Sequence, residues 1–152
     1  MVLMSKETGP YNIDIVRDPS GNAIEIFERA SASCATGGSK LMVDDRAAAE
    51  EFYKETFDVT IRTYYQSDTY DEVIIDYDNG PFHALYQPVN EEAAPKSIFP
   101  QTAIYTSNFD QVLAKIKKRG LGYREFDTPT QGLRIIFAQD PSGNAIEVIS
   151  RN

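Results

Sequence analysis

The sequence predicts an α+β protein with two βαβββ units, preceded by an extra N-terminal β-hairpin. Two observations support this prediction. The eight residues Asp-Pro-Ser-Gly-Asn-Ala-Ile-Glu occur twice, at 18–25 and at 140–147. In addition, the order strand, helix and three strands can be read twice, at 39–88 and at 97–152. A repeated string within a repeated order of elements indicates internal duplication.

The repeated octapeptide has the composition of a turn between two strands. Proline fixes φ, glycine and asparagine tolerate a positive φ, and aspartate and serine bond nearby backbone. Alternating apolar residues flank both copies, so we expect two β-hairpins. The first copy lies at 11–28, in a stretch (1–30) interpreted as the last part of a third unit. Residues 1–10 show no pattern.

The first unit begins with a short apolar strand at 40–43. It ends at Asp44-Asp45, and either aspartate can begin a helix as its N-cap. The helix is expected at 45–57, where apolar residues recur at helical spacing. Three further strands, rich in β-branched and aromatic residues, are expected at 60–66, 72–77 and 82–87.

The second unit repeats this order after a polar connector at 90–96. A strand is expected at 101–106 and a helix at 108–120, with Ser107 and Asp110 resembling a capping box and Gly120 ending the helix. The last strands are expected at 123–126, 133–138 and 145–150. The two units superpose at a spacing of 63 residues, which aligns Gly80 with Gly143 (143 − 80).

Composition narrows the classes of function. The formal net charge of −8 argues against nucleic acid as the main partner, because phosphate binding requires Lys and Arg. No apolar run approaches the roughly 20 residues that span a bilayer. The single cysteine, Cys34, excludes an internal disulfide framework and is typical of a reducing compartment. We therefore expect a cytoplasmic protein.

Two βαβββ units that end in hairpins of the type Asp-Pro-x-Gly-Asn-x-Ile-Glu resemble the vicinal oxygen chelate superfamily. Its members include glyoxalase I, bleomycin-resistance proteins, extradiol dioxygenases and fosfomycin-resistance enzymes. The helix starts at 43–53 and 108–120 are also similar to that family. The resemblance covers about 39–151 and implies one domain at 39–152, with a curved mixed sheet around a cavity. By analogy it also implies a homodimer.

In metal-dependent members of that superfamily, the first and last strands of each unit supply the ligands of a divalent ion. The resemblance places the four corresponding positions at Gly38, Ala84, Gln101 and Glu147. Gln101 and Glu147 can bind a metal, whereas Gly38 and Ala84 offer no side-chain ligand. The first unit therefore lacks its half of such a site.

Two other residues are candidates to complete it. His83, the only histidine, is next to Ala84, but strand alternation directs it to the opposite face unless a bulge shifts the register. Glu25 occupies the corresponding position of the partial unit, and a second subunit could bring it to the metal. Aromatic side chains add a further expectation. The predicted ligand-binding residues are Phe82, Ala84, Tyr86, Gln101, Tyr105 and Glu147.

These observations predict a glyoxalase/bleomycin-resistance-like protein that binds a small, partly aromatic molecule in the cavity between units, with no cofactor and no complete metal site. The alternative is a metal-dependent lyase, isomerase or dioxygenase that uses Zn, Ni, Mn or Fe, with the site completed by Glu25, His83 or a second subunit. A third interpretation gives the N-terminal hairpin a role in assembly, because open strand edges recruit strands. Whether the protein is an enzyme stays open.

Overall fold

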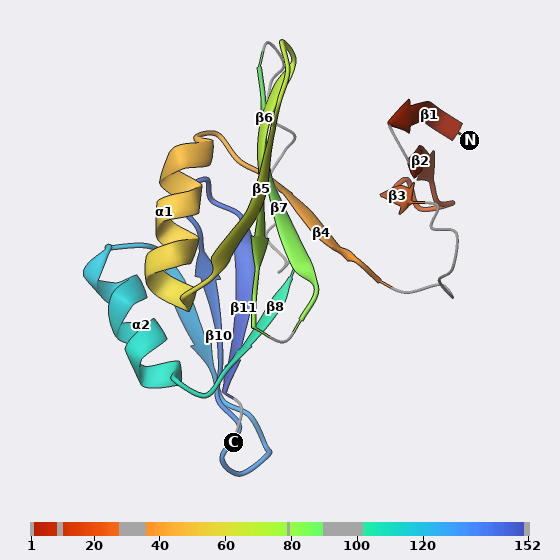
Figure 1. Ribbon diagram of the computed structural model, residues 1–152. Coiled ribbons are helices and arrows are strands. Elements are labelled where there is room, and N and C mark those ends of the chain that lie inside the picture. The colour runs from red at the N-terminus through yellow and green to blue at the C-terminus, as the bar shows by residue number, and fades with distance from the viewer. Residues whose placement is uncertain (1, 9–10, 28–35, 79, 90–101, 151–152) are drawn as a thin grey trace. The chain divides into compact units, whose positions relative to one another are not determined.

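The computed structural model describes residues 2–8, 11–27, 36–78, 80–89 and 102–150 (Figure 1). The chain divides into two compact units, Met1–Thr36 and Gly37–Asn152, which are called the N-terminal unit and the main unit below. The connector predicted at 90–96 lies outside the described residues.

The N-terminal unit contains one antiparallel sheet with the strand order β1-β2-β3. The strands are β1 (Val2–Thr8), β2 (Tyr11–Arg17) and β3 (Ala23–Phe27). The predicted hairpin is β2–β3, closed by the first octapeptide. Strand β1 was not predicted, because residues 1–10 show no pattern in the sequence. Its sequence shows no alternation, but main-chain pairing with β2 requires none.

The main unit contains the two predicted βαβββ units, called the first and second repeats below, which confirms the α+β class. The first repeat consists of β4 (Gly38–Met42), α1 (Arg46–Phe57), β5 (Thr60–Gln66), β6 (Tyr70–Asp76) and β7 (Phe82–Pro88). The second consists of β8 (Ala103–Thr106), α2 (Phe109–Lys118), β9 (Tyr123–Phe126), β10 (Ile135–Gln139) and β11 (Ala145–Ser150).

Both repeats form four-stranded mixed sheets with the same topology. The orders are β4-β7-β6-β5 and β8-β11-β10-β9, and in each the first strand runs parallel to the last. Lys40 lies opposite Ala84 in one sheet, and Ala103 lies opposite Glu147 in the other. Both pairs are related by the predicted 63-residue spacing, so the strands of the two repeats share one register.

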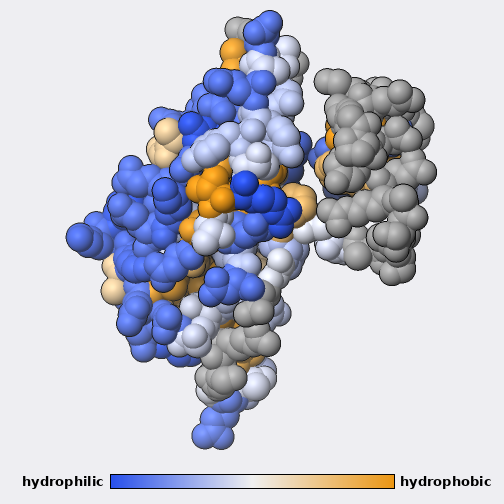
Figure 2. Space-filling view, viewed as in Figure 1, coloured by the Kyte–Doolittle hydropathy of each residue, from blue (hydrophilic) through white to orange (hydrophobic). Residues whose placement is uncertain are grey.

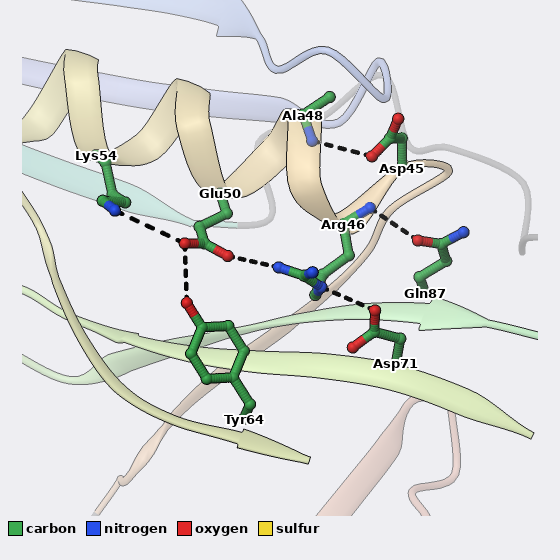
Figure 3. Close-up of polar contacts among 8 residues, drawn as sticks. All are labelled: Asp45, Arg46, Ala48, Glu50, Lys54, Tyr64, Asp71 and Gln87. Carbon is green, nitrogen blue, oxygen red and sulfur yellow. Dashed lines mark hydrogen bonds and ion pairs between the residues drawn. The ribbon is translucent and has the colours of Figure 1, made fainter. Parts of the chain in front are cut away.

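Helix α1 begins with a side-chain cap. Asp45 has extended backbone, and its Oδ1 accepts a hydrogen bond of 2.9 Å from the Ala48 N–H. The next residue, Arg46, ties the helix to the sheet, since its Nε donates to Asp71 Oδ2 on β6 at 2.9 Å (Figure 3). Glu50 extends this contact by accepting from Arg46 and from the Tyr64 hydroxyl. These bonds fix the first turn of α1 above β5 and β6.

The predicted capping box of α2 is wrong. The N-cap is Asn108, whose side chain makes no capping bond, and its N–H instead donates to Thr106 Oγ1 at 3.0 Å. Ser107 therefore lies before the cap, and Asp110 accepts from Arg134 at 2.5 Å instead of reaching back. The C-terminal end of α2 was predicted more accurately. Gly120, with φ of 67°, follows the C-cap Arg119.

One apolar core is shared by the two repeats. The apolar residues at helical spacing face this core: Ala49, Phe52 and Tyr53 of α1 are buried and Phe57 is partly buried, and the four apolar residues of α2 are also buried (Phe109, Val112, Leu113 and Ile116). The helices lie beside each other on one side of the strands (Figure 1), and Arg119 of α2 pairs with Glu51 and Glu55 of α1. Their outer surface is largely hydrophilic (Figure 2).

Neither helix among the described residues has the length and apolar character that crossing a membrane requires.

Candidate functional site

Each sheet of the main unit has one face toward the helices and one face away from them. Leu41, Val73, Ile75 and Leu85 point to the helices and lie in the core. Strand alternation sends the intervening residues to the other face, called the distal face below. The distal residues of the first repeat are Gly38, Lys40, Glu72, Ile74, Phe82, Ala84 and Tyr86, and those of the second are Ala103, Tyr105, Ile135, Phe137, Glu147 and Ile149.

Most predicted site residues therefore fall on corresponding strands of the two sheets. Phe82, Ala84 and Tyr86 share the distal face of β7, and Tyr105 and Glu147 occupy the distal face of the second repeat. Gln101 lies outside the described residues.

A lysine and a glutamate that the sequence analysis did not single out are central to the distal face of the first repeat. Lys40 Nζ lies 3.0 Å from Glu72 Oε2 and 4.9 Å from the centroid of the Tyr86 ring. Tyr86 in turn stacks on Tyr70, with centroids 5.3 Å apart. The ammonium group is thus held between a carboxylate and an aromatic face, both of which stabilise a cation.

The sequence could not reveal this cluster because its members come from three strands. Lys40 is on β4, Glu72 on β6 and Tyr86 on β7, and only the register brings them together. One signal was present. Glu72 precedes the apolar run Val73-Ile74-Ile75, and a carboxylate in a buried strand calls for a cationic partner.

The other end of this distal face is also aromatic and charged. Arg62 lies over the Phe82 ring, 4.9 Å from its centroid, and pairs with Asp76. On the second repeat, Phe126 and Phe137 contact each other with centroids 4.2 Å apart. Glu147 is half-buried on the same face, in the pair with Ala103. Aromatic rings beside a few polar groups are typical of small-molecule sites.

The position of Gly38 tests whether the first repeat could contribute to a metal site. A Cβ added there would lie 2.2 Å from the Phe82 carbonyl oxygen and 2.6 Å from its ring. No side chain fits without moving the β4–β7 pair, and Ala84 has no donor atom. Over the part of the chain that the structure describes, no three His, Cys, Asp or Glu residues gather as metal ligands. The two positions of the first repeat that the resemblance assigns to metal ligands therefore offer no side-chain donor.

His83 lies on the helix-facing side of β7, as strand alternation indicated. Its Nδ1 is 2.8 Å from the Tyr77 hydroxyl and its Nε2 is 2.6 Å from Thr102 Oγ1. Burial lowers the pKa of His83 to about 4, so the ring is neutral at pH 7. Because Thr102 directly precedes β8, these bonds join the two repeats in the interior.

Glu25 belongs to the N-terminal unit. It lies on β3, opposite Ile15 of β2, and is exposed.

Comparison with known proteins agrees with this architecture. The profile of the Glyoxalase/Bleomycin resistance protein/Dioxygenase superfamily matches residues 34–148. No match was found among the curated proteins.

Solved structures with this fold are distant in sequence. A glyoxalase I variant from Zea mays has 18% identity and a TM-score of 0.72; the alignment covers 98% of this chain, which spans 58% of the maize chain. TnmS3, an antibiotic binding protein from Streptomyces sp. CB03234, has 18% identity and a TM-score of 0.60, with 80% and 99% covered.

A third structure with this fold contains a metal. It is a variant of the fosfomycin resistance protein FosX from Listeria monocytogenes, complexed with Mn(II) and 1S,2S-dihydroxypropylphosphonic acid. It has 15% identity and a TM-score of 0.60, with 77% of this chain and 90% of that chain covered. The profile match spans most of the sequence and both repeats, and the chain therefore belongs to the Glyoxalase/Bleomycin resistance protein/Dioxygenase superfamily.

Proposed function

We propose that this protein binds a small, partly aromatic molecule on the distal faces of its two repeats, without a metal ion. The observation that supports this most is the closed position at Gly38, where the Phe82 backbone and ring leave no room for a side chain. The second position that the resemblance assigns, Ala84, has no donor atom, so these two positions of the first repeat cannot provide their half of a four-ligand ion site.

The distal residues suit a ligand with an aromatic part. Tyr86, Phe82 and Phe137 offer ring surfaces, and Lys40 and Glu147 offer charged groups that can fix its orientation. TnmS3, an antibiotic binding protein, has the same fold. We further propose that Tyr105, Glu147 and Gln101 contribute to the same binding site, and that the protein is a cytoplasmic homodimer.

Metal analysis tests the first part of the proposal. Purified protein is expected to carry no stoichiometric metal and to bind none in titrations with Zn, Ni, Mn or Fe. Stoichiometric metal that is lost in Glu147→Ala would contradict the proposal. The matched control is Glu125→Ala, which removes an exposed carboxylate of the same repeat that pairs with Lys117.

Ligand binding tests the second part. A panel of small aromatic molecules, followed by calorimetry, is expected to yield binders whose affinity falls about tenfold in Tyr86→Ala, the loss typical of a buried ring contact. Tyr123→Ala is the control, because Tyr123 is an exposed tyrosine of β9 that points to the helix side. Equal losses in both variants would argue against the distal face.

The position of Glu147 supports a second candidate function, that of a metal-dependent lyase, isomerase or dioxygenase. Its half-buried carboxylate occupies the position that the superfamily resemblance assigns to a metal ligand, and FosX with the same fold was solved with Mn(II). A second subunit would then have to complete the ligand set. The metal titration above separates the two functions.

A further inference from the structure

Two oppositely charged residues flank an aromatic residue on the distal face of the second repeat. Arg124 of β9 lies directly opposite Phe137 of β10, and Phe137 lies directly opposite Glu147 of β11. Arg124 belongs to the distal face because its two neighbours in β9 lie opposite the core residues Ile136 and Ala138. The three residues therefore form one row across three strands. Adjacent strands are about 4.8 Å apart, so the backbones at the two ends of the row are separated by roughly 10 Å.

The guanidinium group at one end of this row is supported by aromatic rings. It lies over the Phe126 ring, 4.9 Å from the centroid, and this ring contacts Phe137 with centroids 4.2 Å apart. Arg124 is exposed, and no carboxylate pairs with it among the residues that the structure describes. A guanidinium on an aromatic face keeps its planar set of N–H donors, which matches a carboxylate in a bidentate pair.

The carboxylate at the other end of the row also has no ion pair. Glu147 is half-buried, and over the described part of the chain its side chain makes no hydrogen bond or salt bridge. Its neighbour on β8 is Ala103, which is small and exposed, so no bulky cross-strand side chain covers it on that side. A cationic group placed there would meet the carboxylate and lie close to the Phe137 ring, and both attract a cation.

An arginine of the first repeat provides a comparison. Arg62 also lies over an aromatic ring, that of Phe82, but its charge is offset by an ion pair with Asp76. Arg124 has no such pair within the described residues, and Phe137 occupies the position between it and Glu147. A molecule with a carboxylate and an ammonium at opposite ends of a ring would offset both charges.

We propose that the ligands of the distal face are small aromatic zwitterions. The ligand places its carboxylate on Arg124, its ring against Phe137 and its ammonium on Glu147. This inference rests on the proposed function, because it specifies the charges of the molecule that binds there. Both contacts are charge-assisted, and among the described residues neither has to displace an ion pair within the protein.

Four benzene derivatives with the same ring size and para substitution separate the two charges. Both charges are present in para-(aminomethyl)benzoate, only the anion in para-methylbenzoate, only the cation in para-methylbenzylamine, and neither in para-methylbenzamide. Calorimetry with the full chain is expected to show affinity falling about tenfold for each charge removed, the loss typical of a charge-assisted hydrogen bond. The net charge of −8 repels anions, so tighter binding of para-methylbenzoate than of the amide reports a local cation.

Variants assign each charge to its residue. Arg124→Gln is expected to weaken binding of the zwitterion and of para-methylbenzoate about tenfold and to leave para-methylbenzylamine unchanged. Glu147→Gln is expected to weaken the zwitterion and the amine and to leave para-methylbenzoate unchanged. The retained affinity of one probe shows in each case that the binding face is intact. Glu125→Gln is the matched control, because Glu125 is the next residue of β9, lies on the helix side and pairs with Lys117.

Three outcomes would overturn the inference while leaving the proposed function intact. They are equal affinity of the unsubstituted protein for the four probes, a preference for only one of the two charges, and charge preferences that survive in the variants. Binding of other small aromatic molecules but none of these four would overturn it as well. If the unsubstituted protein binds no small aromatic molecule at all, the proposed function itself fails.

Discussion

The two copies of the octapeptide fold into the same turn in two different units of the chain. In each copy the aspartate accepts from the main chain and the side-chain amide of the asparagine four residues later, Asn22 in one and Asn144 in the other, at 2.8 to 2.9 Å. The glycines have positive φ angles of 90° and 80°. The local structure is therefore specified by the eight residues alone.

The surroundings of the two turns differ. The first is exposed, whereas Asp140 and Asn144 of the second are each 1% exposed. Asn144 Nδ2 also donates to the Met42 carbonyl, and Ser142 Oγ accepts from the Asp44 N–H. The second turn is thus bound to the end of β4 and to the segment that leads into α1 in the first repeat. The same sequence serves as a simple turn in one place and as a joint between repeats in the other.

Substitutions in the strand that follows the turn should show the largest difference in stability between the two copies. Ile146 is 0% exposed and Ile24 is 46% exposed. Ile146→Ala is expected to lower the free energy of unfolding of the main unit by about 3 kcal/mol, through lost burial and a cavity. Ile24→Ala is expected to change it by less than about 0.5 kcal/mol. Urea unfolding followed by near-ultraviolet circular dichroism measures both, and similar losses would mean that the first hairpin is as deeply packed as the second.

Substitution of the asparagine of the turn should show a smaller difference in stability between the two copies. Asn144→Ala removes the side-chain hydrogen bonds from Asn144 Nδ2 to the Met42 carbonyl and to the buried Asp140 carboxylate, so we expect the free energy of unfolding of the main unit to fall by about 2 kcal/mol. Asn22→Ala removes the same local bonds at the surface and is expected to leave the main unit unchanged. If Asn22→Ala greatly changed the unfolding of the main unit, the proposed difference between the two copies of the turn would be wrong.

The pKa values of the two aspartates should be shifted in opposite directions. Bonds from Asn22 lower the pKa of Asp18 below 3.8, whereas burial raises that of Asp140 above 3.8. Between the unfolded value and its folded pKa, Asp140 is protonated in the native state and ionised in the unfolded chain, so its contribution to stability falls as pH rises. The contribution of Asp18 is instead lost as pH falls through its folded pKa. Carboxyl carbon NMR titrations check both directions, and two equal values would contradict the contrast.

Much of the fold was predictable because it depends on local pattern. The strands at Thr60–Gln66, Tyr123–Phe126 and Ala145–Ser150 were predicted with these bounds, and the buried stripes of both helices follow from their spacing. The sequence-based predictions were wrong where the local structure depends on a contact with a residue distant in sequence. Strand β1 depends on pairing with β2, and Asp110 bonds to Arg134, which is distant in sequence.

The distal face was predictable only in part. Strand alternation placed Phe82, Ala84 and Tyr86 together and sent His83 to the other face, because side-chain direction is a property of a single strand. The pair of Lys40 and Glu72 was missed, because it requires β4, β7 and β6 to lie side by side in a known register. A partner from another strand has no local signature.

The sequence by itself determined the repeat, the order of elements and the geometry of the Asp-Pro-Ser-Gly-Asn turn, since backbone preferences and apolar periodicity act over a few residues. The tertiary structure alone decided which copy of the turn is buried, which charges meet on the distal face and why Gly38 cannot be a ligand. The physical reason is that burial and pairing are set by distant segments, and identical residues acquire different energies when different neighbours surround them.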